Sequence, residues 1–316
     1  MLFDSHAHLN NADMTEEDRA LMVSQIEASM EAGGTAALDY VMDIGFDPDS
    51  SELAVTHAQE YPWCYAAVGC HPHDAKVMDE AQLEKIRELT KDPKVCAIGE
   101  IGLDFHYDLS PRDVQREWFR RQIRLANELK MPICIHAREA DQEVMDILVE
   151  EGAFSEERLS WFPKRPDSSG FCKGRSAGWW AADDQGAAPE AGSQEASPER
   201  SSGVTRDARV LLHCFSGSAE LGKQYVRMGA TLSIAGPVTY KNNKKTVSVA
   251  EQIPADFLLV ETDSPYLSPV PLRGKPNTPP NVEYTARKVA EIKGIPFEEL
   301  AAKTKENAMR FYGLEG

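Results

Sequence analysis

The sequence lacks several features that would assign the protein to other classes. It has no run of about 18 apolar residues, the length needed to span a bilayer, and its first residues lack the basic and apolar regions of a signal peptide. None of its six cysteines forms a C-x-x-C pair, so neither a zinc knuckle nor a thioredoxin-like motif is indicated. We therefore expect a cytoplasmic protein that engages no membrane and shows no sign of an obligate protein partner.

Positive charge is also scarce. The 34 lysines and arginines face 51 aspartates and glutamates, which gives a formal net charge of −17. A surface with this charge repels nucleic acid and anionic membranes unless a local site or a bound metal reverses the field. Any phosphate-containing substrate must therefore be bound locally.

Short apolar segments rich in β-branched residues alternate with helical patterns along the whole chain, which is typical of parallel βαβ units. Eight such units without a G-x-G-x-x-G after the first strand favour a closed (β/α)8 TIM-type barrel, an α/β fold, over a doubly wound open sheet. The expected strands are Leu2–His6, Ala36–Ile44, Cys64–Gly69, Val95–Gly99, Pro132–His136, Arg209–His213, Thr231–Ala235 and Phe257–Glu261. The expected helices include Glu16–Ala32, Ala81–Thr90, Arg112–Leu129, Ala140–Glu150, Ala219–Met228, Glu283–Ile292 and Phe297–Phe311.

One segment, residues 166–208, interrupts this alternation. Of its 43 residues, 24 are Ala, Gly, Ser or Pro, and Val204 is its only Val, Ile, Leu or Met. Such a segment buries too little apolar surface to offset the entropy lost on ordering. We expect a low-complexity, largely disordered insertion within a single barrel domain that spans residues 1–316. The alternative is a lid or a partner-binding segment.

Seven of the eight histidines fall at or just beyond the C-terminal end of an expected strand. In a (β/α)8 barrel this end of the strands carries the active site. These histidines are His6, His8, His71, His73, His106, His136 and His213.

Strand parity indicates which of these side chains enter the barrel, because alternate residues of a strand face its interior. Cys134 and His136 share the inward parity, and Glu100 is expected to share the inward parity of Ile98. Four histidines and two carboxylates are thereby expected to converge at the C-terminal end of the strands. They are His6, His8, Glu100, His136, His213 and Asp263.

Imidazole and carboxylate ligands without a thiolate suit Zn²⁺, Mn²⁺ or a similar divalent ion. Six ligands are too many for one tetrahedral zinc with an open position. They fit two ions about 3.5–4 Å apart with a bridging carboxylate. Any single histidine could instead be a structural residue with satisfied hydrogen bonds.

Six motifs carry these residues in order along the chain. They are Phe3-Asp4-Ser5-His6-Ala7-His8, Gly69-Cys70-His71-Pro72-His73, Gly99-Glu100-Ile101-Gly102-Leu103-Asp104, Ile135-His136-Ala137-Arg138, His213-Cys214-Phe215-Ser216-Gly217 and Glu261-Thr262-Asp263-Ser264-Pro265-Tyr266. With them the chain resembles the TatD family of metal-dependent hydrolases, within the amidohydrolase-like barrels. The resemblance covers the chain except for the insertion and implies a metal-dependent deoxyribonuclease, usually of the 3′→5′ exonuclease type.

The resemblance also implies a role for each ligand. His6, His8, Glu100 and Asp263 would hold one of two divalent ions (Mg²⁺, Mn²⁺ or Zn²⁺). Glu100 would bridge to the second ion, held together with His136 and His213. Asp263 would orient the metal-bridging water and accept its proton, and the resulting hydroxide would attack the phosphodiester bond.

Other positions near these motifs are candidates for supporting roles. Four residues could contact a substrate phosphate, although the histidines could equally stabilise a turn and the arginines could be solvated charges: His71, His73, Arg138 and Arg273. Asp104 and Glu261 could orient ligand histidines. His136 and His213 lie further apart in sequence than is usual in the family, so substrate access depends on which face the insertion covers.

The expected substrate is a DNA end or a small phosphodiester. A metal-dependent ester or amide hydrolase, such as a D-aminoacyl-tRNA deacylase, is the nearest alternative, and a metal-binding scaffold barrel without catalysis is a third. The chain has no extended basic or aromatic stripe, which argues against tight sequence-specific binding of nucleic acid.

Overall fold

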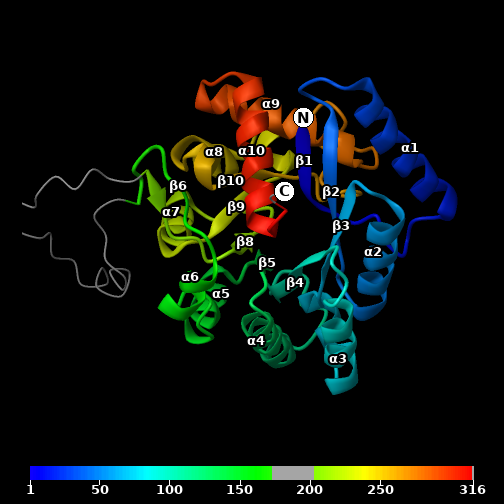
Figure 1. The fold of residues 1–316 in the computed structure, drawn as a ribbon, viewed down its shortest axis with the longest axis vertical. Helices are drawn as coiled ribbons and strands as arrows, with labels where there is room; N and C mark the ends of the chain where they lie inside the picture. Colours follow the sequence, from blue (N-terminus) through cyan, green and yellow to red (C-terminus); the bar gives the residue numbers. More distant parts are fainter. Residues whose placement is uncertain (173–202, 315–316) are drawn as a thin grey trace, which may run out of the picture.

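The structure is a computed structural model that describes residues 1–172 and 203–314. Eight parallel strands form one sheet in the order β1-β2-β3-β4-β5-β8-β9-β10, and helices surround this nearly closed barrel (Figure 1). The last strand returns to the first: the amide of His8 donates to the carbonyl of Ser264 (2.8 Å), and the amide of Asp263 donates to the carbonyl of His6 (2.9 Å). The predicted (β/α)8 TIM-type barrel is confirmed.

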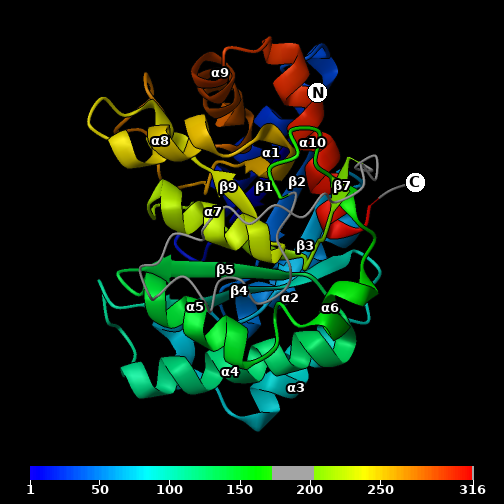
Figure 2. The same ribbon diagram turned by 90° about the vertical axis from the view of Figure 1, so that its left-hand side faces the viewer.

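The barrel strands are β1 (Leu2–Ala7), β2 (Leu38–Ile44), β3 (Cys64–Val68), β4 (Val95–Asp104), β5 (Ile133–Arg138), β8 (Val210–Leu212), β9 (Thr231–Ile234) and β10 (Leu258–Val260). The α-helices are α1 (Glu16–Ala32), α2 (Pro48–Glu60), α3 (Glu80–Leu89), α4 (Arg112–Leu129), α5 (Asp141–Glu150), α6 (Glu156–Trp161), α7 (Ala219–Met228), α8 (Lys244–Gln252), α9 (Val282–Lys293) and α10 (Phe297–Tyr312). Figure 2 shows α3 and α4 on one side of the strands and α9 and α10 on the other. Among the helices in the described ranges, none combines the length and apolar character needed to cross a membrane.

Three helices go beyond those expected from periodicity: the short α6 and the longer α2 and α8. Helix α2 has Pro48 in its first turn, and the Asp47 side chain caps it by accepting from the amide of Ser50 (2.7 Å). Helix α8 has nine residues and is capped in the same way by Asn243. These capping residues are the local signal for both helices, because each satisfies backbone donors that a helix start leaves free.

Helix α10 closes the end of the barrel at which the strands begin. Phe311 and Tyr312 pack against Phe3 and Leu259 in the apolar cluster of the barrel interior. The Tyr312 hydroxyl donates to the carbonyl oxygen of Ser5 at 2.9 Å. The interior is therefore a packed apolar core at this end, and polar side chains can gather only at the opposite end.

A bulge in β4 corrects the expected parity of this strand. Ile98 pairs with Ile133 and Ile101 pairs with Ile135, so β4 contains one residue more than β5 over this stretch. Ile98 belongs to the apolar layer between strands and helices, not to the barrel interior. The expectation that Glu100 shares an inward parity with Ile98 is therefore wrong. The extra residue turns Glu100 inward, as bulges beside active sites commonly do.

Glycines let β4 approach β5 closely at the bulge. A Cβ added at Gly102 (φ +148°) would collide with the carbonyl oxygen of His136, and one added at Gly99 would lie 2.6 Å from the Cβ of Cys134. Only glycine has the space to fit at these positions. The close approach brings the strand that carries Glu100 against the strand that carries His136.

The structure describes both ends of the 166–208 segment, while residues 173–202, on which most of the expected insertion falls, lie outside the described residues. Strands β6 (Arg165–Pro166) and β7 (Val204–Thr205) pair antiparallel. The fully buried Arg165 guanidinium donates to the carbonyls of Ala230 (2.7 Å) and Val226 (2.9 Å). Both ends of the segment are thus fixed where β8 and β9 begin, opposite the end of the barrel at which the histidines gather.

Replacing Gly102 with alanine tests the close approach of β4 and β5. We expect Gly102→Ala to lower the free energy of unfolding by roughly 3 kcal/mol or more, because a buried carbonyl and a strained φ oppose the new Cβ. Gly34→Ala is a matched control, since Gly34 also has positive φ (+83°) but no atom within 4 Å of an added Cβ. Urea unfolding of both variants measures the difference, and equal stabilities would contradict the argument.

Candidate active site

A cavity of about 650 Å³ opens at the C-terminal ends of the barrel strands. Its volume lies in the range of sites for small molecules. Histidines, carboxylates and aromatic side chains from successive strand ends line it. They include His8, Phe46, His71, His73, Asp74, Glu100, Tyr107, His136, Arg138, His213, Asp263 and Tyr266.

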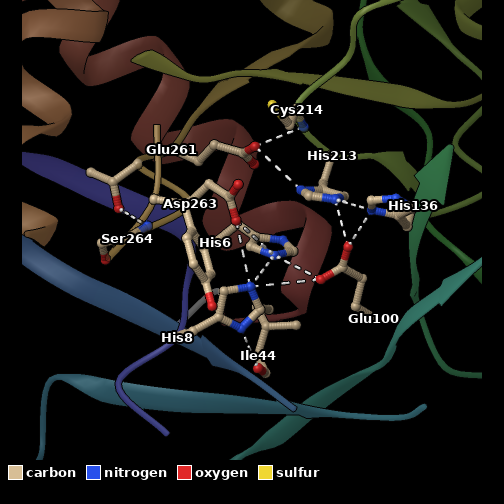
Figure 3. A network of polar contacts seen from close by, with 12 residues as sticks. His6, His8, Ile44, Glu100, His136, His213, Cys214, Glu261, Asp263 and Ser264 are labelled. Carbon is tan, nitrogen blue, oxygen red and sulfur yellow. Dashed lines mark hydrogen bonds and ion pairs between the residues drawn. The ribbon is translucent and has the colours of Figure 1, made fainter. Parts of the chain in front are cut away.

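The first cluster of donor atoms lies at the ends of β1 and β10, with Glu100 of β4 reaching across (Figure 3). The Nε2 atoms of His6 and His8 lie 3.3 Å apart. The Oε2 atom of Glu100 lies 3.3 Å from the first and 3.7 Å from the second. The Oδ1 atom of Asp263 lies 3.5 Å from Nε2 of His8 and 3.9 Å from Nε2 of His6.

The second cluster gathers around the other oxygen of Glu100. Its Oε1 atom lies 2.7 Å from Nδ1 of His136 and 2.7 Å from Nε2 of His213, and these two nitrogens are 3.3 Å apart. His71 joins the same cluster, with Nε2 at 3.5 Å from Oε1. A single carboxylate therefore presents one oxygen to each cluster.

The chemistry and spacing of these donors fit divalent cations. Ligand atoms about 2.0–2.2 Å from one ion lie roughly 3.0–3.5 Å from one another in tetrahedral or octahedral sites. The observed separations are close to this range, and His6-His8-Glu100, His6-His213-Asp263 and His71-Glu100-His136 each form a compact potential ligand set. The six predicted ligands come together, and His71 lies closer to them than its expected role in substrate binding suggests.

The buried charges of the site favour a cation between the carboxylates. Burial by itself would raise the pKa of Glu100, but the charges of His213 and His71 hold it well below its ordinary value. Burial by itself would lower the pKa of His8, but Asp263 and Glu100 raise it to about 8. The carboxylates are thus ionised at neutral pH and stabilise positive charge beside them.

Several side chains and one backbone carbonyl hold the donor residues in place. Asp104 places Oδ2 at 3.2 Å from Nε2 of His136 and at 2.9 Å from Nε2 of His73. The carbonyl oxygen of Ile44 lies 2.8 Å from Nδ1 of His8. Such outer contacts fix the tautomer and orientation of an imidazole.

Glu261 supports the second cluster from the end of β10. Its Oε1 atom lies 3.5 Å from Nδ1 of His213 and accepts from the amide of Cys214 at 2.7 Å. Its Oε2 atom accepts a short hydrogen bond from the hydroxyl of Ser233. Both oxygens are therefore engaged, so the carboxylate has a fixed position behind the imidazole.

The predicted substrate contacts separate into two groups. His73 and Arg138 line the cavity, and the Arg138 guanidinium lies 4.6 Å from the centre of the Tyr107 ring. Arg273 is not among the lining residues; it stacks on the ring of Tyr240 at 4.2 Å. The structure therefore brings Arg138 to the cavity and leaves Arg273 outside it.

Two tyrosines of the cavity were missed by sequence reasoning. Tyr107 and Tyr266 line the cavity, yet they remain 54% and 50% exposed. Both follow a motif aspartate by three residues, Asp104 and Asp263, and the amide of each tyrosine bonds to that aspartate. This spacing, which carries the ring from the strand end to the cavity rim, is the signal that could have identified them.

The chain is similar to known hydrolases over its whole length. A family model described as TatD related DNase matches residues 3–313. A metal-dependent hydrolase of Bacillus subtilis, YabD, is 39% identical over 99% of this chain and 100% of its own length. The 3′-5′ ssDNA/RNA exonuclease TatD of Escherichia fergusonii is 29% identical over 88% of this chain and 89% of its own. The crystal structure of YjjV, a TatD homologue from Escherichia coli, superposes with a TM-score of 0.74 at 20% identity, covering 99% of this chain and 98% of that one.

Replacing Glu100 with glutamine tests its position between the clusters. We expect Glu100→Gln to reduce the binding of Mn²⁺ from two ions per chain to one or none, because a neutral amide cannot offer anionic oxygens to two cations. Calorimetric titration measures the stoichiometry. Glu139→Gln, which alters a carboxylate that is 66% exposed, should bind like the unmodified protein, and two-ion binding by Glu100→Gln would refute the assignment.

Replacing Glu261 with glutamine separates support of a ligand from ligation itself. We expect Glu261→Gln to keep the stoichiometry but to weaken Mn²⁺ binding about 10- to 100-fold, because His213 loses the charge behind its ring. The same titration gives the dissociation constants. Glu220→Gln, on the exposed surface of α7, provides the control, and an unchanged affinity for Glu261→Gln would show that Glu261 does not act through His213.

Proposed function

Because the chain belongs to the TatD family of metal-dependent hydrolases, we propose that it is a deoxyribonuclease that removes nucleotides from the 3′ ends of single-stranded DNA. The resemblance expected from the six motifs is thus confirmed at the level of the family. The observation that carries the proposal is the division of Glu100 between two donor clusters. This arrangement suits hydrolysis of a phosphodiester, and the name of the Escherichia fergusonii relative supports the choice of substrate.

The positions of the donor atoms support an assignment of residues to each ion. His6, His8, Glu100 and Asp263 would hold one, and Glu100, His136 and His213 would hold the other. When bound, two divalent ions lower the pKa of an attacking water and neutralise the charge that develops on the phosphoryl group.

Asp263 is the proposed proton acceptor. Burial by itself would raise its pKa, but His8, His6 and His213 lower it, so the carboxylate is ionised at neutral pH and can take a proton from the attacking water. Its backbone has φ +57°, a conformation that aspartate tolerates better than most residues. The preceding Thr262 holds this turn, since its amide donates to the Asp4 carboxylate at 2.8 Å.

The cavity rim offers contacts for a nucleotide. Arg138 can bind a phosphate through two parallel hydrogen bonds, and its guanidinium is kept in place by stacking on Tyr107. The exposed rings of Tyr107 and Tyr266 provide flat surfaces for bases, and base stacking on an aromatic ring contributes about 1–3 kcal/mol. A single-stranded end suits these contacts better than a duplex, whose bases are already stacked.

A panel of metals and substrates tests the function directly. We expect purified protein with Mg²⁺ or Mn²⁺ to release mononucleotides from a 5′-labelled single-stranded oligonucleotide, and EDTA to abolish the release. Hydrolysis of esters, amides or D-aminoacyl-tRNA without release of nucleotides would replace the proposal by the alternative hydrolase. If the protein binds metal but neither releases nucleotides nor hydrolyses esters or amides, the alternative of a metal-binding scaffold barrel would be favoured.

Replacing Asp263 with asparagine tests the proton acceptor. We expect Asp263→Asn to lower kcat by about 10²- to 10⁴-fold, the usual contribution of general acid–base catalysis. Metal content measured on the same samples distinguishes loss of proton transfer from loss of an ion. Asp146→Asn, on the exposed surface of α5, is the control. Wild-type rates for Asp263→Asn would exclude Asp263 from the reaction.

A further inference from the structure

The loops around the cavity carry opposite charges on its two sides. The loops that follow β1, β2, β3 and β4 each contain an aspartate, namely Asp13, Asp47, Asp74 and Asp108. Asp74 lines the cavity itself, and burial together with the charge of Asp47 raises its pKa. Arg112 pairs with Asp108 (2.9 Å) and Lys76 acts on Asp74, but Asp13 and Asp47 add further negative charge, so this side of the rim is less favourable for a polyanion than the other side.

The loops that follow β9 and β10 have the opposite composition. Residues 221–250 and 264–282 contain no aspartate or glutamate, in a chain whose net charge is −17. Five basic residues of these loops and of the start of α8 are exposed: Lys241, Lys244, Lys245, Arg273 and Lys275. We call this group the basic lip.

Contacts between the two loops hold the basic lip together beside the cavity. The Arg273 guanidinium lies 4.2 Å from the centre of the Tyr240 ring. The Tyr240 hydroxyl donates to the carbonyl oxygen of Ser268 at 2.9 Å, and the amide of Val270 donates to Thr239 Oγ1 at 2.8 Å. Pro237 and Leu267, one from each loop, line the cavity wall. The basic residues are thus separated in sequence and gathered by the fold, which is why no basic stripe is visible in the sequence.

One acidic group faces the basic lip across the barrel rim. Burial raises the pKa of Asp141, at the start of α5, and the charge of Lys245 opposes this shift. Arg138 lies three residues before Asp141 and lines the cavity. Arg138 on the cavity wall thus adds a cation to this side of the rim.

We propose that the basic lip binds the phosphates of single-stranded nucleic acid that extend beyond the cavity, 5′ of the terminal nucleotide. The inference rests on the proposed function for the position of the 3′ end. The acidic side of the rim directs the nucleic acid away from the loops after β1–β4. Lysines bind phosphates as point charges and do not recognise the bases. The site therefore has two parts: donor clusters that act on the terminal bond, and a lip that retains the strand.

A triple variant tests the basic lip. We expect Lys241→Ala/Lys244→Ala/Lys245→Ala to raise KM for a single-stranded dT12 about tenfold without changing kcat, and to leave hydrolysis of bis(p-nitrophenyl) phosphate unchanged, because that compound is too small to reach the lip. The dependence of log KM on log salt concentration should become shallower by about 2, since each lost phosphate contact removes about 0.7.

The control variant carries the same change in net charge elsewhere. Lys91, Lys164 and Lys288 lie on the surface outside the rim, so their replacement by alanine should leave KM and its salt dependence within twofold of the wild-type values. Circular dichroism confirms that both variants are folded. A lip variant that behaves like this control would overturn the inference.

A binding measurement separates this inference from the proposed function. Fluorescence anisotropy of a labelled phosphorothioate dT12 in Mn²⁺ reports binding whether or not cleavage occurs. If the wild type and the control variant bind dT12 and only the lip variant binds it more weakly, the basic lip is supported. This holds even if DNA is not cleaved and the proposed function fails. If DNA is cleaved but the wild type and the lip variant bind dT12 equally, the basic lip is overturned and the proposed function stands. If the wild type does not bind dT12 at all, the basic lip is overturned too.

Discussion

The structure depends on placing one carboxylate, Glu100, inside the barrel. Its side chain is 4% exposed, and a buried carboxylate is costly unless charged or hydrogen-bonding partners surround it. Imidazoles from three other strands supply those partners, with His6 on one oxygen and His136 and His213 on the other. The two ends of the barrel differ accordingly: α10 fills one with apolar side chains, and polar groups occupy the other.

The strand that carries Glu100 shows how closely backbone and site are linked. A regular β4 would direct position 100 towards the helices, so the bulge is what turns the carboxylate inward. The bulge in turn needs glycine, because the backbone of β4 runs too close to β5 at Gly99 and Gly102 for a side chain. Gly99 and Gly102 thus determine the position of the Glu100 carboxylate, which contacts both donor clusters.

Sequence reasoning succeeded where strands are regular and failed where they are not. Along β5, alternation correctly separated Ile133 and Ile135, which face the helices, from Cys134, which faces the interior. On β4 the alternation rule failed because of the bulge. A bulge arises from the pairing of two strands, so it is not visible in the two-residue period of one strand's sequence. The motif Gly99-Glu100-Ile101-Gly102-Leu103-Asp104 still identified Glu100, because the resemblance of a motif does not depend on strand parity.

Features that involve two distant segments were beyond sequence reasoning for the same reason. Nothing near Arg165 shows that its guanidinium is buried against the carbonyls before β9, so the side of the barrel at which the insertion begins could not be predicted. Net charge is a similar case, because it sums over the whole chain while electrostatic forces between exposed groups fall off within about 8–10 Å in physiological salt. A single-stranded nucleic acid that approaches the rim is repelled by Asp74 on one side and attracted by Lys241 on the other. The local distribution of these charges therefore matters more than the formal net charge of −17.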